Sequence, residues 1–267
     1  MSEERNKKAR GNKRKSGGNF RILILVFAVI LVVILAMTLV SHFKKEKAQE
    51  KNAKGVAYLK SLEKQDVSKI QKKIKSNRAS IGLALADTDE SAVWAAMTDE
   101  VILGDSRAVG FSYYEFMSED HVFAESGKQI TDAVAYLDQL EALQPTEIFL
   151  CYGLNDIKSG NWPTADAYAT EYETQVKTLK KKLPDTTIYI NSILPATGEG
   201  LASDSVYSQI DEYNSQLKSM CEKNDWPYID NTDVAKAHED LYETDGLHLV
   251  REFYKYWAAN MLSQLEN

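Results

Sequence analysis

Cysteine, histidine, glycine and proline are all scarce in this chain, and each shortage excludes a class of protein. Two cysteines in 267 residues are too few for a disulfide framework. Neither they nor the four histidines have the spacing of a zinc site, and there is no glycine-rich phosphate loop. Thirteen glycines and five prolines, beside 44% hydrophobic residues, exclude a collagen-like or wholly disordered chain.

The two cysteines lie in segments that are expected to be buried. Cys151 stands in an apolar, strand-like run and Cys221 in a helix-like one. We predict free, buried thiols, with a single disulfide bridge as the alternative if the body lies outside the cytoplasm.

Positive charge is almost confined to the N-terminal part of the chain. Residues 1–43 carry eight Lys/Arg and two acids, and residues 44–78 carry 12 Lys/Arg and four acids. Residues 79–267 carry 12 Lys/Arg against 33 Asp/Glu, a net charge of −21. Because nucleic-acid affinity depends largely on neutralised phosphates, so acidic a body excludes DNA and RNA as partners.

Ile22 to Val40 forms a 19-residue run without a charged side chain, rich in Ile, Leu and Val. A helix of that length measures about 28 Å, close to the roughly 30 Å of a bilayer core. A cleavable signal peptide is the alternative, but its apolar region usually has about 7–15 residues and ends at an A-x-A-like site, which is missing here. We therefore predict a retained transmembrane anchor over residues 22–40.

Basic residues on either side of this run indicate its orientation. Eight Lys/Arg precede it and five follow it closely. The excess predicts a cytoplasmic tail over residues 1–21 and an extracytoplasmic body, with reversed topology as the alternative.

Residues 41–80 are rich in Lys, Glu, Gln and Ala, lack proline and carry a thin apolar stripe, which predicts a charged helical stalk. The stalk could lie against anionic lipid or wall polymer, but we favour a solvated spacer.

Residues 81–267 have a length that suits one domain, in which short apolar runs alternate with amphipathic stretches. This alternation predicts βαβ units and a parallel sheet covered on both faces. The predicted strands are Val101–Gly104, His121–Ala124, Glu147–Tyr152, Thr187–Leu194 and Tyr228–Ile229, and the predicted helices are residues 129–143, 166–182, 205–224 and 252–265.

Polar residues suited to catalysis follow the first three predicted strands. Ser106 stands in Gly104-Asp105-Ser106, Gly127 follows the second strand, and Asn155 stands in Gly153-Leu154-Asn155-Asp156. Because the carboxyl ends of parallel strands form one edge of a sheet, these residues are expected at a common crevice. Taken singly, each has an ordinary explanation as a helix cap or a turn residue.

His248 is the best candidate for a general base among the four histidines. His42 flanks the apolar run, His121 begins a strand and His238 lies in a polar loop. Asp245 precedes His248 by three residues on a glycine-containing loop, so its carboxylate can orient the imidazole. The alternative is a structural, hydrogen-bonded histidine.

The sequence contains four short blocks in a fixed order. They are Gly-Asp-Ser, a glycine after the second strand, Gly-x-Asn-Asp and Asp-x-x-His. The body, from about residue 99 to the C-terminus, thereby resembles the SGNH hydrolase family, also called GDSL hydrolases. The resemblance implies a three-layer α/β/α fold around a five-stranded parallel sheet with flavodoxin-like strand order, and no metal or organic cofactor. It does not extend to the anchor or the stalk.

The resemblance also implies a role for each matched residue. Ser106 corresponds to the nucleophile, His248 to the general base and Asp245 to the residue that orients it. The backbone N–H groups of Ser106 and Gly127 and the side chain of Asn155 correspond to the oxyanion donors.

Residues near these blocks are expected to support the site or to contact the substrate. Asp105 is expected to support the loop of the nucleophile. Arg107 could bind a substrate anion, but we favour pairing with a nearby carboxylate. Tyr152 and Trp162 could stack on a sugar or could simply pack at the rim.

We therefore expect a membrane-anchored, extracytoplasmic serine esterase that removes small acyl groups, acetyl above all, from carbohydrate or related esters. The alternatives are an O-acyltransferase that uses the same residues on envelope polysaccharide, with a partner protein supplying the acyl donor, and an inactive glycan-binding module. The intact set of Ser106, Asn155, Asp245 and His248 argues against the inactive module.

Overall fold

A computed structural model describes residues 83–265 and, nearer the N-terminus, residues 27, 31, 35, 37–47, 51 and 54–56. The chain divides into two compact units, Met1–Val67 and Ser68–Asn267. Most of the predicted anchor and stalk lies outside the described residues. Within the part that is described, no helix is both long enough and apolar enough to cross a membrane.

The body is built around a five-stranded sheet in which every pair of neighbouring strands is parallel. The strand order, β2-β1-β3-β4-β5, is the flavodoxin-like order that the family resemblance implies. The strands are β1 (Val101–Gly104), β2 (Val122–Ala124), β3 (Glu147–Cys151), β4 (Thr187–Asn191) and β5 (Tyr228–Ile229).

The central strands are apolar at consecutive positions because both faces of the sheet are covered. All five residues of β3 are buried. Ile148 and Leu150 belong to one buried cluster, whereas Phe149 between them belongs to the other. Successive side chains of a strand point to opposite faces, so a sheet between two helical layers needs both kinds of position to be apolar.

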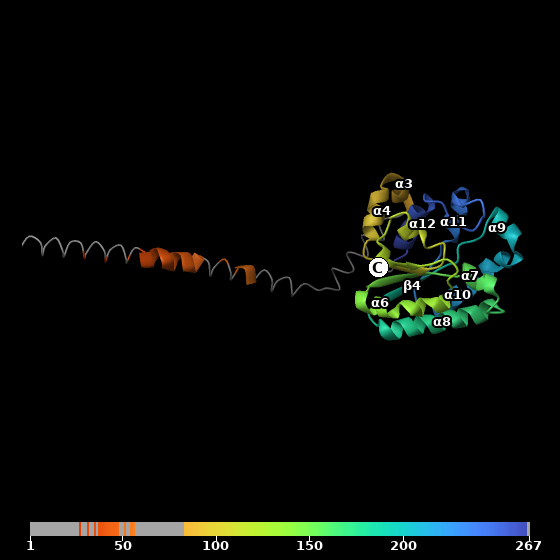
Figure 1. The fold of residues 1–267 in the computed structure, drawn as a ribbon, viewed down its shortest axis with the longest axis horizontal. Coiled ribbons are helices and arrows are strands. Elements are labelled where there is room, and N and C mark those ends of the chain that lie inside the picture. Colours follow the sequence, from red (N-terminus) through yellow and green to blue (C-terminus); the bar gives the residue numbers. More distant parts are fainter. Residues whose placement is uncertain are drawn as a thin grey trace, which may run out of the picture. The chain divides into compact units, whose positions relative to one another are not determined.

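Helices cover the sheet on both sides, as Figure 1 shows, and make the three-layer fold that was predicted. One layer contains the 3₁₀ segment η2 (Ile130–Tyr136), α6 (Leu137–Leu143), α8 (Ala165–Lys182) and α10 (Ile210–Asn224). The other contains α3 (Leu83–Thr88), α4 (Glu90–Ala96), α11 (Thr232–Ala237) and α12 (Phe253–Ser263).

The predicted strands and the helices predicted over 166–182 and 252–265 are confirmed, with boundaries that differ by a few residues. Residues 129–143 form η2 followed by α6, and residues 205–224 form η3 (Ser205–Gln209) followed by α10, so each of these two predicted helices begins as a 3₁₀ segment. The sequence analysis did not predict the shorter elements. These are α3 and α4, which pack on α12, together with η1 (Glu119–His121), α5 (Gly110–Tyr113), α7 (Leu154–Ser159), α9 (Gly198–Ser203), α11 and η4 (Glu239–Leu241).

Cys151 and Cys221 are both buried and both free, so the bridged alternative is wrong. They belong to different buried clusters on opposite faces of the sheet. Burial raises the pKa of each thiol, which keeps both protonated and unreactive at neutral pH.

Candidate active site

Ser106 lies in a tight turn between β1 and α5. A Cβ at Gly104 would stand 2.5 Å from the Cβ of Ala108 and 2.8 Å from the carbonyl oxygen of Cys151. Glycine is therefore the residue that lets the chain turn so close to β3. The turn leaves Ser106 partly exposed between two buried neighbours, Asp105 and Arg107.

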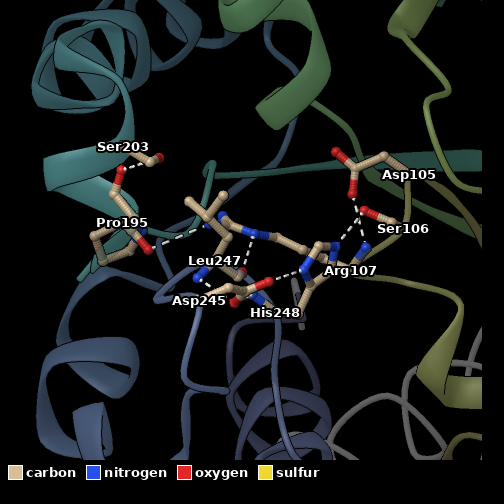
Figure 2. A network of polar contacts seen from close by, with 9 residues as sticks. Asp105, Ser106, Arg107, Pro195, Ser203, Asp245, Leu247 and His248 are labelled. Atoms are coloured by element: carbon tan, nitrogen blue, oxygen red, sulfur yellow. Dashed lines mark hydrogen bonds and ion pairs between the residues drawn. The ribbon is translucent and has the colours of Figure 1, made fainter. Parts of the chain in front are cut away.

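The hydroxyl of Ser106 meets an imidazole from the far end of the chain. Its Oγ lies 3.0 Å from Nε2 of His248. The other ring nitrogen, Nδ1, lies 2.6 Å from Oδ2 of Asp245. These three side chains form one continuous line of hydrogen bonds (Figure 2). A serine hydroxyl that contacts an imidazole oriented by a carboxylate is the arrangement that activates serine for nucleophilic attack.

Asp245 is held in its charged form by the same loop. Burial raises the pKa of its carboxyl group, but hydrogen bonds from the His248 side chain and from the N–H groups of His248 and Leu247 lower it to about 2. The group is therefore a carboxylate at every pH near neutrality. Its second oxygen, Oδ1, accepts both backbone hydrogen bonds, so the carboxylate is fixed in orientation.

The loop that carries Asp245 and His248 is closed by backbone hydrogen bonds. The N–H of Glu243 donates to the carbonyl oxygen of His248 at 2.8 Å, and the N–H of Thr197 donates to that of Gly246 at 2.9 Å. Gly246 has φ +65, and a Cβ there would stand 2.0 Å from the carbonyl oxygen of Thr197. Only glycine fits this position, because both its conformation and its close contact exclude a side chain.

Arg107 connects the His248 loop to the segment that follows β4. Its guanidinium group is buried and donates to the backbone carbonyl oxygens of Leu247, Leu194 and Pro195. The sequence analysis favoured a carboxylate partner, and that expectation is wrong for the hydrogen bonds. Figure 2 shows the side chain of Arg107 extending between Pro195 and Leu247, beside His248.

Asp105 supports the turn that carries Ser106, as expected from the sequence. Its Oδ1 accepts a hydrogen bond from the N–H of Arg107 at 3.0 Å. Burial raises the pKa of its carboxyl group, and the positive charge of Arg107 partly offsets that rise.

Gly127 and Asn155 follow the two strands on either side of β1. Gly127 is exposed, with φ +82, and Asn155 is partly buried at the start of α7. Nδ2 of Asn155 donates to the carbonyl oxygen of Lys128, next to Gly127, at 3.0 Å. Since an amide nitrogen has two hydrogens, one of them remains for another acceptor. The two loops are thus joined at the edge of the sheet where Ser106 lies.

A pocket of about 280 Å³ opens beside Ser106 and His248. The sequence analysis missed most of the residues that line it, because Tyr113, Tyr114 and Tyr254 lie in helical or turn segments without a motif. The signal that could have indicated them is the pair of adjacent tyrosines, seven residues beyond the candidate nucleophile. By contrast, Tyr152 is buried and Trp162 packs against Tyr168.

The other chemically versatile side chains are engaged elsewhere. His238 stacks on Tyr256, with ring centroids 3.7 Å apart, and Nδ1 of His121 lies 2.9 Å from Asp120. Among the described residues, no group of three or more His, Cys, Asp or Glu side chains is arranged to hold a metal ion.

Comparison with known proteins identifies the family. The model of the GDSL-like lipase/acylhydrolase family matches residues 102–256, more than half of the chain. A comparison with curated protein sequences found no match. Among solved structures, the chain is similar to a carbohydrate esterase family 3 protein from Talaromyces cellulolyticus, at 16% identity and a TM-score of 0.48 over 63% of this chain and 96% of that one.

Two bacterial structures are also similar. One is a GDSL-like lipase from Bacteroides thetaiotaomicron VPI-5482, at 17% identity and a TM-score of 0.47 over 61% of this chain and 84% of that one. The other is a Streptococcus pneumonia protein named for platelet activating factor, at 21% identity and a TM-score of 0.50 over 80% of this chain and 99% of that one. This last likeness shows a shared fold. The match of the family model shows that the chain belongs to the GDSL-like lipase/acylhydrolase family and is a hydrolase.

Proposed function

We propose that this hydrolase is an extracytoplasmic serine esterase that removes small acyl groups, acetyl above all, from carbohydrate or related esters. The observation that carries the proposal is the line of hydrogen bonds from Ser106 through His248 to Asp245. Family membership supports ester hydrolysis, and the geometry supports the role of each residue.

In the first half of the reaction, Nε2 of His248 accepts the proton of Ser106, whose oxygen attacks the carbonyl carbon of the ester. The charged Asp245 stabilises the imidazolium that forms. The imidazolium then donates its proton to the departing alcohol as the bond between the carbonyl carbon and the alcohol oxygen breaks. An acyl group remains on Ser106.

The negative charge on the carbonyl oxygen needs hydrogen-bond donors that are already in place. We assign this role to the N–H groups of Ser106 and Gly127 and to Nδ2 of Asn155. These donors follow the adjacent strands β1, β2 and β3, and the contact between Asn155 and Lys128 holds two of the three loops together. Preorganised donors of this kind each contribute about 10²–10³-fold to the rate in other hydrolases.

In the second half, His248 takes a proton from water, which attacks the acyl group and releases the acid. The side chains of His248 and Asp245 are 43% and 46% exposed, so water reaches the acyl-enzyme. A pocket of about 280 Å³ lies at the small end of the range for ligand sites, which suits a group about the size of one sugar ring.

The extracytoplasmic location rests on the uncharged run of residues 22–40 and on the excess of Lys/Arg before it. An enzyme held at that surface meets the polysaccharides of the cell envelope, which is why carbohydrate esters are proposed as substrates.

Covalent labelling tests the nucleophile and the location together. Intact bacterial cells that express the full chain are treated with a membrane-impermeant, charged fluorophosphonate, and the modified peptide is identified by mass spectrometry. We expect a phosphonyl group on Ser106 in intact cells, with loss of fluoride. The Ser219→Ala variant, changed on the exposed surface of α10, should label normally, and Ser106→Ala should not label.

The two parts of the proposal fail separately. Labelling of Ser106 only after cell lysis contradicts the extracytoplasmic location and leaves the nucleophile intact. Absence of labelling in lysed cells, together with no hydrolysis of p-nitrophenyl acetate, contradicts the serine mechanism.

Arg107 is expected to act as a positioning residue. Lysine keeps the charge but cannot donate in several fixed directions to three carbonyl oxygens, so Arg107→Lys should loosen the loop of His248. Since small displacements of a catalytic group cost up to about 100-fold, we expect kcat for p-nitrophenyl acetate to fall about 10- to 100-fold while KM changes little.

The matched control for this change is Arg251→Lys. The guanidinium group of Arg251 stacks on Phe116 and pairs with Glu90, neither of which belongs to the His248 loop, so kcat should be preserved. An Arg107→Lys enzyme with the kcat of the wild type would show that these hydrogen bonds do not position His248.

A further inference from the structure

The pocket beside Ser106 and His248 is acidic and aromatic. The charged side chains among its lining residues are Glu243 and Asp245, and no Lys or Arg is found among the described residues that line it. Glu243 is exposed. An anion entering this pocket would therefore meet two carboxylates and no Lys or Arg among the lining residues. Arg251 lies outside this lining, where its guanidinium group stacks on Phe116 and pairs with Glu90.

Three tyrosines make a continuous wall in the same pocket. The ring centroids of Tyr113 and Tyr114 are 5.0 Å apart and those of Tyr114 and Tyr254 are 5.5 Å apart, both pairs in edge-to-face contact. Tyr254 is fixed by a hydrogen bond from its hydroxyl to the carbonyl oxygen of Arg107. Tyr113, at 75% exposure, offers a free ring face at the mouth of the pocket.

The chemistry of the proposed reaction indicates which part of the ester enters this pocket. The departing alcohol takes its proton from Nε2 of His248, so it must lie on the histidine side of Ser106. The pocket is lined by His248 and Asp245, whereas Gly127 and Asn155, the proposed oxyanion donors, are not among its lining residues. The alcohol part of the substrate, rather than the acyl part, therefore fits here.

We propose that this pocket binds the alcohol part of the ester and selects uncharged or cationic polyhydroxylated alcohols, such as neutral sugars and amino sugars, while excluding anionic ones such as uronic acids and phosphorylated sugars. The inference rests on the proposed esterase function. Tyr113 supplies a ring face for the sugar, and Glu243 supplies hydrogen-bond acceptors for hydroxyl or ammonium groups. The charges of Glu243 and Asp245 repel a carboxylate or phosphate.

Three acetyl esters that differ in the charge of the alcohol test the selection. The probes are acetylcholine, an acetylated methyl glucoside and the corresponding acetylated methyl glucoside carrying a 6-carboxylate, with the full chain as enzyme. We expect kcat/KM for the carboxylate to be about tenfold or more below that for the neutral sugar, with the difference shrinking as salt is added.

Two variants assign the selection to individual side chains. Glu243→Gln should reduce the preference for the neutral ester over the anionic one about threefold to tenfold. Glu222→Gln, an exposed change on α10 away from the pocket, should leave the preference as it is. Tyr113→Ala should raise KM for the sugar ester by a larger factor than KM for ethyl acetate, which has no ring to stack.

The outcomes separate this inference from the proposed function. If ethyl acetate and p-nitrophenyl acetate are hydrolysed but the anionic sugar ester is cleaved as well as the neutral one, the inference is wrong and the esterase stands. The same holds if Glu243→Gln leaves the preference unchanged. If no acetyl ester is hydrolysed, the proposed function is contradicted, and the inference with it.

Discussion

Ser106→Ala and His248→Ala are each expected to lower kcat for acetyl-ester hydrolysis by about 10⁴-fold or more while KM changes little. The reason is the 3.0 Å contact between Ser106 Oγ and His248 Nε2. Without the hydroxyl there is no acyl-enzyme, and without the imidazole the hydroxyl stays protonated. Steady-state hydrolysis of p-nitrophenyl acetate measures both variants.

The two groups act as one unit, so their effects should not add. The double variant is expected to have about the same residual activity as either single variant. Asp245→Asn should cost less, about 10²–10⁴-fold, because it removes a charge and alters the tautomer of His248 but leaves Ser106 and the imidazole in place. An additive double variant, or an Asp245→Asn variant as active as the wild type, would contradict the assigned roles.

Matched controls exclude loss of structure as the cause. Ser219→Ala removes an exposed hydroxyl from α10, and His121→Ala removes a partly buried imidazole that lies outside the pocket and is hydrogen-bonded to the exposed Asp120. Both should keep the activity of the wild type. Thermal unfolding of all the variants should remain cooperative.

Much of the fold could be predicted because its cause is local. A strand buried on both faces must be apolar at consecutive positions, as Glu147–Cys151 is, and the amphipathic period of residues 166–182 indicated α8. The helices α3 and α4 escaped prediction because they are only six and seven residues long, too short for a period to be distinguished. Their stability comes from packing on α12, which is distant in the sequence.

The candidate site was predictable to a different degree at each residue. Ser106 and His248 are 142 residues apart, so no local pattern could bring them together, and their contact was expected only from the order of the family blocks. The partners of Arg107 could not be predicted, because they are backbone carbonyl oxygens, which every residue type has. The role of Glu243 also depends on the pocket, since an exposed glutamate has no distinctive sequence signal.

Asp156 is expected to make the protein lose stability as the pH rises from about 4 to about 7. Burial is the main cause that raises the pKa of its carboxyl group to about 7. The hydrogen bond that Oδ1 accepts from the N–H of Ile130 lowers the pKa and offsets part of this rise. The unfolded chain therefore gives up this proton near pH 4 and the folded chain near pH 7. Between these values the folded state binds more protons, so the free energy of unfolding falls with pH, by about 4 kcal/mol in all.

The Asp156→Asn variant isolates this effect. The amide oxygen can still accept from Ile130, while the amide nitrogen takes the place of Oδ2, a buried atom without a partner in the part of the chain that the structure describes. The amide has one more unpaired donor than the protonated carboxyl group, which should cost about 1–2 kcal/mol where Asp156 of the wild type is protonated. The variant is therefore expected to be less stable than the wild type near pH 4.5 and more stable near pH 8, as measured by urea unfolding at a series of pH values.

A matched control shows whether the pH dependence of stability belongs to Asp156. Asp185→Asn, an exposed change in the loop before β4, should leave the wild-type pH dependence in place. Subtracting the stability of the wild type from that of the variant also cancels the contribution of Asp245, which is the same in both proteins. The pKa of Asp245 is lowered to about 2, so its contribution to stability is lost only as the pH falls below about 4. A stability difference for Asp156→Asn that stays constant from pH 4.5 to 8 would show that Asp156 is ionised in the folded protein.

The buried Asp156 has a structural role, because it connects α7 to the loop that follows Gly127. Asp156 binds the N–H of Ile130, and its neighbour Asn155 binds the carbonyl oxygen of Lys128, so two consecutive residues of α7 hold the loop that follows Gly127. A protonated carboxyl accepts this hydrogen bond without placing a second negative charge near Asp105, whose charge also raises the pKa of Asp156. The loop of the proposed oxyanion donors is thus held by the side chain of Asp156. This side chain is neutral at mildly acidic pH, where the fold does not have to bury its charge.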